Sequence, residues 1–174
     1  MARNVEIKLR VDDHQGLVQR LRTLGGARDA GILEQRDVFF HCPRGRLKLR
    51  LVPGSPAQLI HYERADAATL RGSQYTLVET ADGDALCATL DAVLGRRGEV
   101  RKRRRLFLLD NVRIHLDEVE GLGRFVEIEA VVDPTHDEAA CHARARELLG
   151  ALGLGDAPTE ACAYIDLLES TPRR

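Results

Sequence analysis

The most regular feature of the chain is an alternation of apolar and charged side chains in segments that have the length of a β-strand. Residues 4–11 alternate strictly, which predicts a strand with one apolar face and one charged face. The apolar positions are Val5, Ile7, Leu9 and Val11. The polar positions are Asn4, Glu6, Lys8 and Arg10.

The same kind of alternation predicts further strands, separated by turns and helices. We expect these strands at residues 37–41, 46–51, 58–64, 74–80, 100–108, 111–117 and 125–132. Pro43-Arg44-Gly45 is typical of a hairpin turn between two of them. Because neighbouring strands are mostly joined by short turns, the pattern favours an antiparallel β-barrel.

Helix signals interrupt the strands at four places. Asp12 and Asp13 supply N-cap chemistry for a first helix that Gly25-Gly26 ends. Asp133-Pro134 is expected to open a later helix that runs to about residue 152. The other helices are expected at residues 82–94 and 164–169. The fold class is therefore α+β, with helices flanking the barrel.

Length and charge narrow the class of protein. The 174 residues can bury a real core, and we expect one domain over residues 1–170 with a short tail at 171–174. The formal net charge of −1 provides no bulk field for nucleic acid or an anionic membrane, so neither is an expected partner. No apolar stretch approaches the roughly 20 residues that cross a bilayer, and the chain begins directly with a strand pattern. We expect a cytoplasmic protein.

Lysine is used sparingly and in a recurring context. Of the 26 basic residues, only Lys8, Lys48 and Lys102 are lysines, and each lies in a strand-like segment with a charged residue two positions away. A compact ammonium differs from a guanidinium fork in size and hydration. The three sites therefore indicate places that need a point charge, unless the distribution is a chance result of arginine bias.

The charged strand faces are segregated by sign, which a face that simply meets water does not require. The carboxylates are Glu6, Glu127 and Glu129. The cations of other strands are Lys48, Arg50, Lys102 and Arg104. If these faces turn inward in a barrel, one wall offers oxygen ligands for Mg²⁺ or Mn²⁺ and the others offer donors for phosphate oxygens. A triphosphate, with about four negative charges, suits such an interior.

An ordered set of segments resembles the CYTH superfamily, the triphosphate tunnel metalloenzymes. Asn4-Val5-Glu6-Ile7-Lys8 resembles the ExExK strand of that superfamily. Further similar segments, in the family order, are 45–50, Tyr62 with Arg64, 100–104, 115–129 with its Gly-Leu-Gly turn, and 164–168. The resemblance covers nearly the whole chain, and the three lysines fall on its lysine positions.

The resemblance implies an eight-stranded antiparallel tunnel that holds a triphosphate through Mg²⁺ or Mn²⁺. The implied metal ligands are Glu6, Glu127 and Glu129, with Asp117 as a further candidate. The residues implied or expected to bind the triphosphate are Lys8, Arg10, Lys48, Arg50, Arg64, Lys102 and Arg104. The candidates for a catalytic role are Lys8, Lys102, Arg104 and His115. His115 enters because it shares a strand face with Asp117.

One position departs from the family pattern, and it bears on the reaction. Asn4 stands where the family has its first glutamate, so the site loses a charged ligand and a second metal would bind more weakly. The run from His115 to Glu129 is most similar to class IV adenylate cyclases, which form cyclic AMP and pyrophosphate from ATP. Hydrolysis of inorganic tripolyphosphate, thiamine triphosphate or a nucleoside triphosphate is the alternative. A non-catalytic polyphosphate or nucleotide binder is a further one, and a homodimer is left open.

The basic run at residues 101–105 has a second interpretation, as a nucleic-acid patch. Its alternation with Val100, Leu106 and Leu108 favours a strand with two basic faces instead. In that case Arg101, Arg103 and Arg105 meet solvent or acidic residues of a neighbouring helix.

Overall fold

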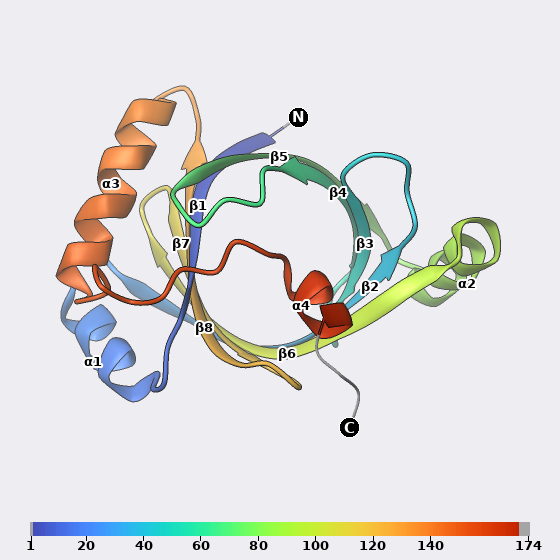
Figure 1. Ribbon diagram of the computed structural model, residues 1–174, viewed down its shortest axis with the longest axis horizontal. Helices are drawn as coiled ribbons and strands as arrows, with labels where there is room; N and C mark the ends of the chain where they lie inside the picture. The colour runs from blue at the N-terminus through green and yellow to red at the C-terminus, as the bar shows by residue number, and fades with distance from the viewer. Residues whose placement is uncertain (1, 171–174) are drawn as a thin grey trace.

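The computed structural model describes residues 2–170, in which eight strands form a closed antiparallel barrel (Figure 1). The expected tail at 171–174 lies outside the described residues. The strands are β1 (Ala2–Arg10), β2 (Arg28–Phe40), β3 (Arg46–Leu51), β4 (Ala57–Arg64), β5 (Arg71–Thr80), β6 (Arg96–Leu109), β7 (Val112–Val119) and β8 (Gly123–Val132). The helices are α1 (Gln15–Thr23), α2 (Gly83–Leu94), α3 (Glu138–Ala151) and α4 (Tyr164–Ser170). The ring order is β1-β5-β4-β3-β2-β6-β7-β8, so the predicted barrel with flanking helices is confirmed.

The first strand closes the ring, because β1 pairs with β5 on one side and with β8 on the other. Glu6 lies opposite Arg71 of β5 and opposite Glu129 of β8. Side chains of a strand alternate between its two faces, so this register turns the polar positions of β1 inward together with those of its neighbours. The charged faces expected from the sequence therefore line the inside of the barrel.

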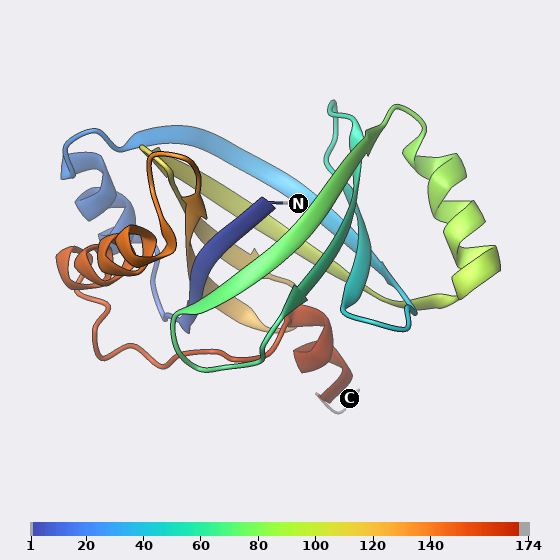
Figure 2. The ribbon, with the colours of Figure 1, turned by 90° about the horizontal axis from the view of Figure 1, so that it is seen from above.

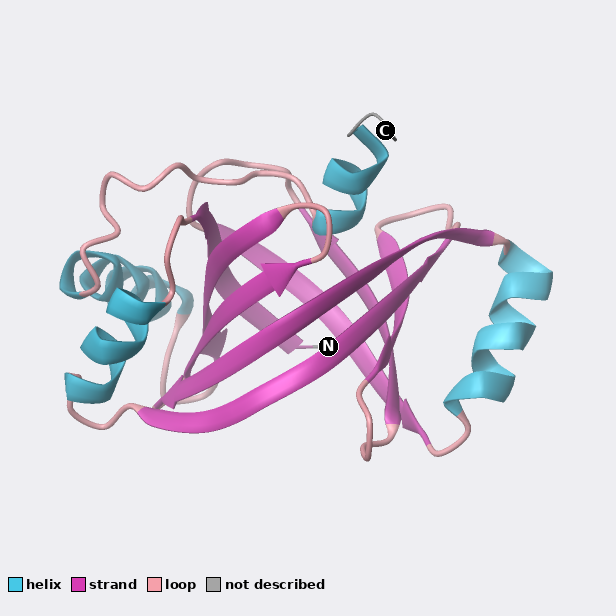
Figure 3. Cartoon of the chain, turned by 90° about the horizontal axis from the view of Figure 1, so that it is seen from below, coloured by secondary structure: helices cyan, strands magenta, loops and turns pink. Residues whose placement is uncertain are grey.

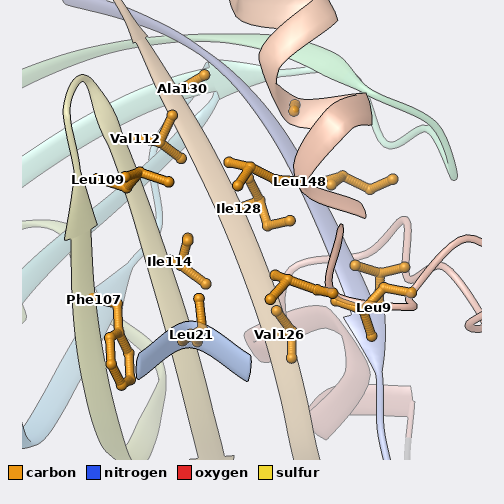
Figure 4. Packing of buried hydrophobic residues seen from close by; sticks show 14 of the residues in the cluster. Leu9, Leu21, Phe107, Leu109, Val112, Ile114, Val126, Ile128, Ala130 and Leu148 are labelled. Atoms are coloured by element: carbon orange, nitrogen blue, oxygen red, sulfur yellow. The ribbon is translucent and has the colours of Figure 1, made fainter. Parts of the chain in front are cut away.

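The main apolar core lies outside the barrel, between the strands and the helices α1 and α3 (Figure 4). The outward positions of β1, β6, β7 and β8 supply one side of it, for example Phe107 and Ile128. Leu21 of α1 and Leu148 of α3 supply the other side. Figure 2 shows both helices at the same end of the molecule. Because the outer face supplies the buried apolar surface that stabilises the fold, the inner face of the same strands can carry charged side chains.

The other two helices cover separate parts of the barrel. α2 packs on β2 and β3, where Cys87 joins Phe40 and Leu49 in a smaller apolar cluster. α4 lies at one mouth of the barrel and packs Tyr164 against Phe125 (Figures 1 and 3). Within residues 2–170, no helix has the length and apolar character that a bilayer span requires.

Several element boundaries differ from those expected, and two of the differences have a clear local cause. β2 was predicted only at residues 37–41, but it begins at Arg28. The early part of β2 is exposed and pairs with β6 through a register shift between Asp29 and Gly31. A bulged, exposed strand carries no apolar alternation, so periodicity could not reveal it.

The third helix starts later than expected, at Glu138 rather than at the Asp133-Pro134 pair. Asp137 is its N-cap, and the Asp137 carboxylate accepts the backbone N–H of Ala140. Asp133 instead accepts the backbone N–H of His136. The Asp-Pro pair therefore marks the turn before the helix.

Candidate functional site

The inside of the barrel is a tunnel whose lining carries charges of both signs. We call the side that carries Glu6, Glu127 and Glu129 the acidic wall, and the side that carries Lys48, Arg50, Lys102 and Arg104 the basic wall. On the acidic wall, Lys8 lies opposite Glu127, and Glu127 also lies opposite His115 of β7. The charged residues that line the tunnel are Glu6, Lys8, Asp37, Lys48, Arg50, Arg64, Lys102, Arg104, Arg113, Glu127 and Glu129. Basic side chains outnumber acidic ones in this lining, so the tunnel as a whole attracts an anion.

Three side chains of the acidic wall come close enough to share one cation. His115, Glu127 and Glu129 each offer a ligand atom, and these atoms lie within 4.8 Å of one another. We call these three residues the ligand cluster. His115 Nδ1 is 3.5 Å from Glu127 Oε2 and 3.8 Å from Glu129 Oε1, and it makes no hydrogen bond although it is buried. Imidazole nitrogen and carboxylate oxygen both bind divalent cations, so the donor set fits a metal ion.

Glu6 adds a further carboxyl to the acidic wall. Burial, together with repulsion from Glu127 and Glu129, raises the pKa of Glu6 to about 8. The guanidinium of Arg64 partly offsets this effect, since its Nη1 atom is 2.9 Å from Glu6 Oε1. A divalent cation beside these carboxyl groups would relieve their repulsion. The electrostatics of the acidic wall therefore fit a divalent metal ion.

Asp37 is the acidic centre of the basic wall. Its oxygens accept hydrogen bonds from Lys48 Nζ at 2.9 Å, Arg50 Nε at 3.2 Å and the Gln35 amide at 3.0 Å. Although burial alone would raise the pKa of Asp37, Lys48 and Arg50 hold it well below its usual value. Burial lowers the pKa of Lys48 to about 8. Asp37 therefore fixes the positions of two cations that face the tunnel.

Asp117 is the centre of a second network, close to α4. It is fully buried and accepts hydrogen bonds from Lys102 Nζ at 3.0 Å, from Arg104 Nε and Nη2 at 2.6 Å, and from the Tyr164 hydroxyl at 3.1 Å. Arg104 and Lys102 keep the pKa of Asp117 low in spite of its burial. The structure thus places Asp117 among the basic residues and outside the ligand cluster.

All three lysines face the tunnel. Lys8 Nζ donates to the carbonyl of Cys162 at 2.5 Å, and burial lowers the pKa of Lys8 to about 8. The Tyr164 ring lies near two of them, with Lys8 Nζ at 4.3 Å and Lys102 Nζ at 4.9 Å from its centroid. The segment before α4 and its first residue therefore help to position two of the lysines.

Arg10 is the predicted binding residue that the structure places apart from the others. It is exposed at the end of β1, donates to Glu160 at 3.1 Å and lies 4.7 Å from the centroid of the Phe125 ring. Asn4 does line the tunnel, and its buried Oδ1 atom has no hydrogen-bond partner. The other predicted triphosphate-binding residues all belong to the tunnel lining.

Several lining residues were not among the predicted site residues. They include Asp37, Phe39, Tyr62, Tyr75, Arg113 and Tyr164. Alternation could have found Arg113, because it shares a strand face with His115. The aromatic residues gave no such signal, since a tyrosine or phenylalanine in a strand usually packs in a core.

The basic run at 101–105 divides between the two faces of β6. Lys102 and Arg104 face the tunnel. On the outside, Arg103 pairs with Glu34 at 3.6 Å and Arg105 with Asp29 at 2.5 Å. Arg101 and Arg103 are largely exposed, as expected for residues that meet solvent, and the acidic partners of Arg103 and Arg105 belong to the neighbouring strand β2 rather than to a helix.

The class of protein is defined by a closed antiparallel β-barrel that encloses a tunnel with an acidic wall and a basic wall. The profile of the CYTH domain matches residues 2–164, and the chain belongs to this family. No curated protein sequence matches the chain.

Several solved structures share the fold. A protein of Pyrococcus horikoshii has 26% sequence identity and a TM-score of 0.83, over 94% of this chain and 98% of its own. A conserved hypothetical protein of Pyrococcus furiosus has 24% identity and a TM-score of 0.81, over 94% and 99%. A "putative adenylate cyclase" of Vibrio parahaemolyticus has 22% identity and a TM-score of 0.76, over 96% and 98%.

Proposed function

We propose that the protein is a metal-dependent enzyme that acts on a triphosphate, with ATP as the substrate and cyclic AMP and pyrophosphate as the products. The observation that carries this proposal is the pairing of an acidic wall, which includes the ligand cluster, with a basic wall inside one closed tunnel. Membership of the CYTH family supports the triphosphate, and the resemblance of residues 115–129 to class IV adenylate cyclases supports the cyclase reaction.

The basic residues have distinct parts in this proposal. Lys48 and Arg50, held by Asp37, and Lys102 and Arg104, held by Asp117, donate to phosphate oxygens from two sides. Because each pair is already oriented by a buried carboxylate, little rearrangement is needed when charge develops on the phosphoryl group.

Glu6, Glu127, Glu129 and His115 are the residues that would hold the divalent ion. When bound, the ion supplies charge neutralisation and polarises a phosphoryl oxygen. Glu6 and Glu127 also face Lys8 across the same wall, where the ammonium can bridge the carboxylates and the substrate.

Aromatic residues in the lining favour a nucleotide over inorganic tripolyphosphate. Tyr62 and Tyr75 line the tunnel, and the Tyr62 ring centroid is 5.6 Å from Lys48 Nζ, so an aromatic surface lies beside a phosphate-binding cation. A purine can stack on such a surface, whereas inorganic tripolyphosphate has no group to place there.

The test is product analysis with ATP and with tripolyphosphate in Mg²⁺ or Mn²⁺, comparing wild type with Glu127→Gln. The matched control is Glu118→Gln, an exposed glutamate of β7. Cyclic AMP with pyrophosphate, lost in Glu127→Gln and kept in the control, is the expected result. Orthophosphate alone would replace the cyclase with a triphosphatase. Absence of turnover with tight triphosphate binding would replace the enzyme with a binding protein.

A further inference from the structure

We propose that His115 is a direct nitrogen ligand of the divalent ion and makes the site prefer Mn²⁺ or Co²⁺ over Mg²⁺. This inference rests on the proposed metal dependence, which it makes more specific. It concerns the ligand cluster alone and is independent of whether the reaction is cyclisation or hydrolysis.

The register of β7 and β8 is the first observation. His115 lies directly opposite Glu127, and Glu129 is the diagonal neighbour on the same face. Directly opposed residues have Cβ atoms about 5 Å apart, and long side chains also reach the diagonal position. The strand pairing therefore forces the imidazole and two carboxylates into one place, with no loop required to bring them together.

The state of the imidazole is the second observation. His115 is only 4% exposed, and its Nδ1 atom is 3.5 Å from the nearest carboxylate oxygen, Glu127 Oε2, which is too far for a well-formed hydrogen bond. A buried polar atom without a partner costs free energy comparable to a lost hydrogen bond, so it calls for an explanation. Nδ1 is directed at Glu127 and Glu129, the two residues whose carboxylate oxygens complete the ligand cluster. A cation bound between the two carboxylates gives this nitrogen a close partner.

Competing contacts leave oxygen atoms available for the ion. Arg104 Nη2 is 3.2 Å from Glu127 Oε2, and Arg113 Nε is 3.1 Å from Glu129 Oε2. The Glu129 oxygen nearer to His115 is the other one, Oε1, whereas the Glu127 oxygen nearer to His115 is the same Oε2 atom that Arg104 contacts. Each carboxylate can therefore keep its arginine and still offer an oxygen toward the imidazole, because a carboxylate has about four lone-pair sites.

The choice of metal follows from the chemistry of the donors. Mg²⁺ prefers oxygen ligands and gives up its water reluctantly, whereas the affinity of a site that includes a nitrogen donor rises along the first transition row from Mn²⁺ through Co²⁺. Asn4, a neutral amide in the tunnel lining, adds no carboxylate that would favour a hard ion. The site thus combines carboxylates with a nitrogen donor, which shifts its preference away from Mg²⁺.

The first measurement uses the wild-type protein with Mn²⁺ alone and needs no turnover. Electron spin-echo envelope modulation of bound Mn²⁺ should contain the ¹⁴N coupling of a coordinated imidazole. The same coupling should vanish in His115→Gln and persist in His142→Gln, a histidine of α3 outside the barrel. Bound Mn²⁺ without ¹⁴N coupling in wild type, or coupling that survives in His115→Gln, would overturn the inference.

The second measurement is competition between Mn²⁺ and Mg²⁺, followed by the electron paramagnetic resonance signal of free Mn²⁺. Wild type should bind Mn²⁺ more tightly than Mg²⁺, and His115→Asp should reduce the ratio of the two affinities. We expect a reduction of about 10- to 100-fold, the range over which changes around metal ligands act. An unchanged ratio of the Mn²⁺ and Mg²⁺ affinities would contradict the assignment of His115 as a metal ligand.

Failure of the inference and failure of the proposed function are distinguishable. If Mn²⁺ binds without nitrogen coupling, His115 is not a ligand but the metal-dependent enzyme stands. If neither ion binds and ATP turns over in the presence of a chelator, the metal dependence itself is wrong.

Discussion

The two faces of the barrel strands share one backbone but differ in the side chains they carry and in the contacts that those side chains make. On β6, Phe107 points outward and is fully buried in the apolar core that α1 and α3 cover (Figure 4). Lys102 and Arg104 of the same strand point inward and donate hydrogen bonds to Asp117. The outer contacts are apolar and gain free energy by leaving water. The inner contacts are buried charges, for which the loss of hydration offsets much of the attraction.

This difference separates stability from binding within single strands. Burial lowers the pKa of each of the three lysines, which means that the folded protein disfavours their charged forms. An anion bound in the tunnel would stabilise the charged forms of these lysines. Substitutions on the outer face should therefore act on folding, and substitutions on the inner face should act mainly on ligand binding.

The largest effect on stability is expected for Phe107→Ala. Removing a fully buried aromatic ring from the outer core should lower the free energy of unfolding by about 3–5 kcal/mol, through lost burial and the cavity left behind. Urea denaturation measures this loss. Phe107→Leu is the matched control and should cost less, since most of the volume is kept. A loss in Phe107→Ala below that of the leucine variant would mean that the outer face is not the main core.

Lys102→Met tests the opposite face of the same strand. The free energy of unfolding should change by less than about 1 kcal/mol or rise, because a desolvated cation is replaced by an apolar chain while Arg104 stays bonded to Asp117. Affinity for ATP in the presence of the metal should fall by about 1.5–3 kcal/mol, the contribution of one hydrogen bond to a charged group. Calorimetry and urea denaturation of one preparation give both numbers. Equal losses in the two would contradict the separation of the faces.

Strict alternation predicted the strands and their charged faces, and the resemblance to the CYTH superfamily predicted that eight of them close into a barrel. In β1, placing Val5, Ile7 and Leu9 in the core forces Glu6 and Lys8 to the other side. What alternation cannot give is register, which depends on contacts between distant strands. It therefore could not show that Glu127 pairs with His115, or that Asp117 binds cations.

The remaining errors have local physical causes. The exposed early half of β2 lacks an apolar face, and the helix signal at Asp133 belongs to a turn. Asp37 begins the strand predicted at residues 37–41, but its role was not predicted because its partners Lys48 and Arg50 lie on β3. A single carboxylate among cations is visible only once the strands are paired.

A smaller effect is expected at the mouth where α4 covers the barrel. Asp166 accepts hydrogen bonds from Arg46 at 2.7 Å and Arg97 at 2.5 Å, and from the backbone N–H of Ala163 at 3.1 Å. Asp166→Asn should lower the free energy of unfolding by about 1 kcal/mol, as expected for partly exposed ion pairs. Amide hydrogen exchange should quicken in α4 more than in β7. Uniform acceleration across both elements would show that α4 does not open separately.

The smallest effect is a pH dependence of ATP affinity that comes from Lys48. Its pKa is lowered to about 8 by burial, so the free protein loses this positive charge as the pH rises above 8. ATP itself keeps a constant charge there, since a terminal phosphate titrates near pH 6. Affinity in Mg²⁺ should therefore weaken between pH 7.5 and 9, by up to about tenfold for a group one unit past its pKa.

Lys48→Arg stays charged and should flatten part of this dependence, with Lys8, whose pKa is also about 8, supplying the rest. Calorimetric titrations of both proteins across the range decide the matter: a flat wild-type profile, or identical profiles for the two proteins, would mean that Lys48 carries no titrating charge onto the phosphates.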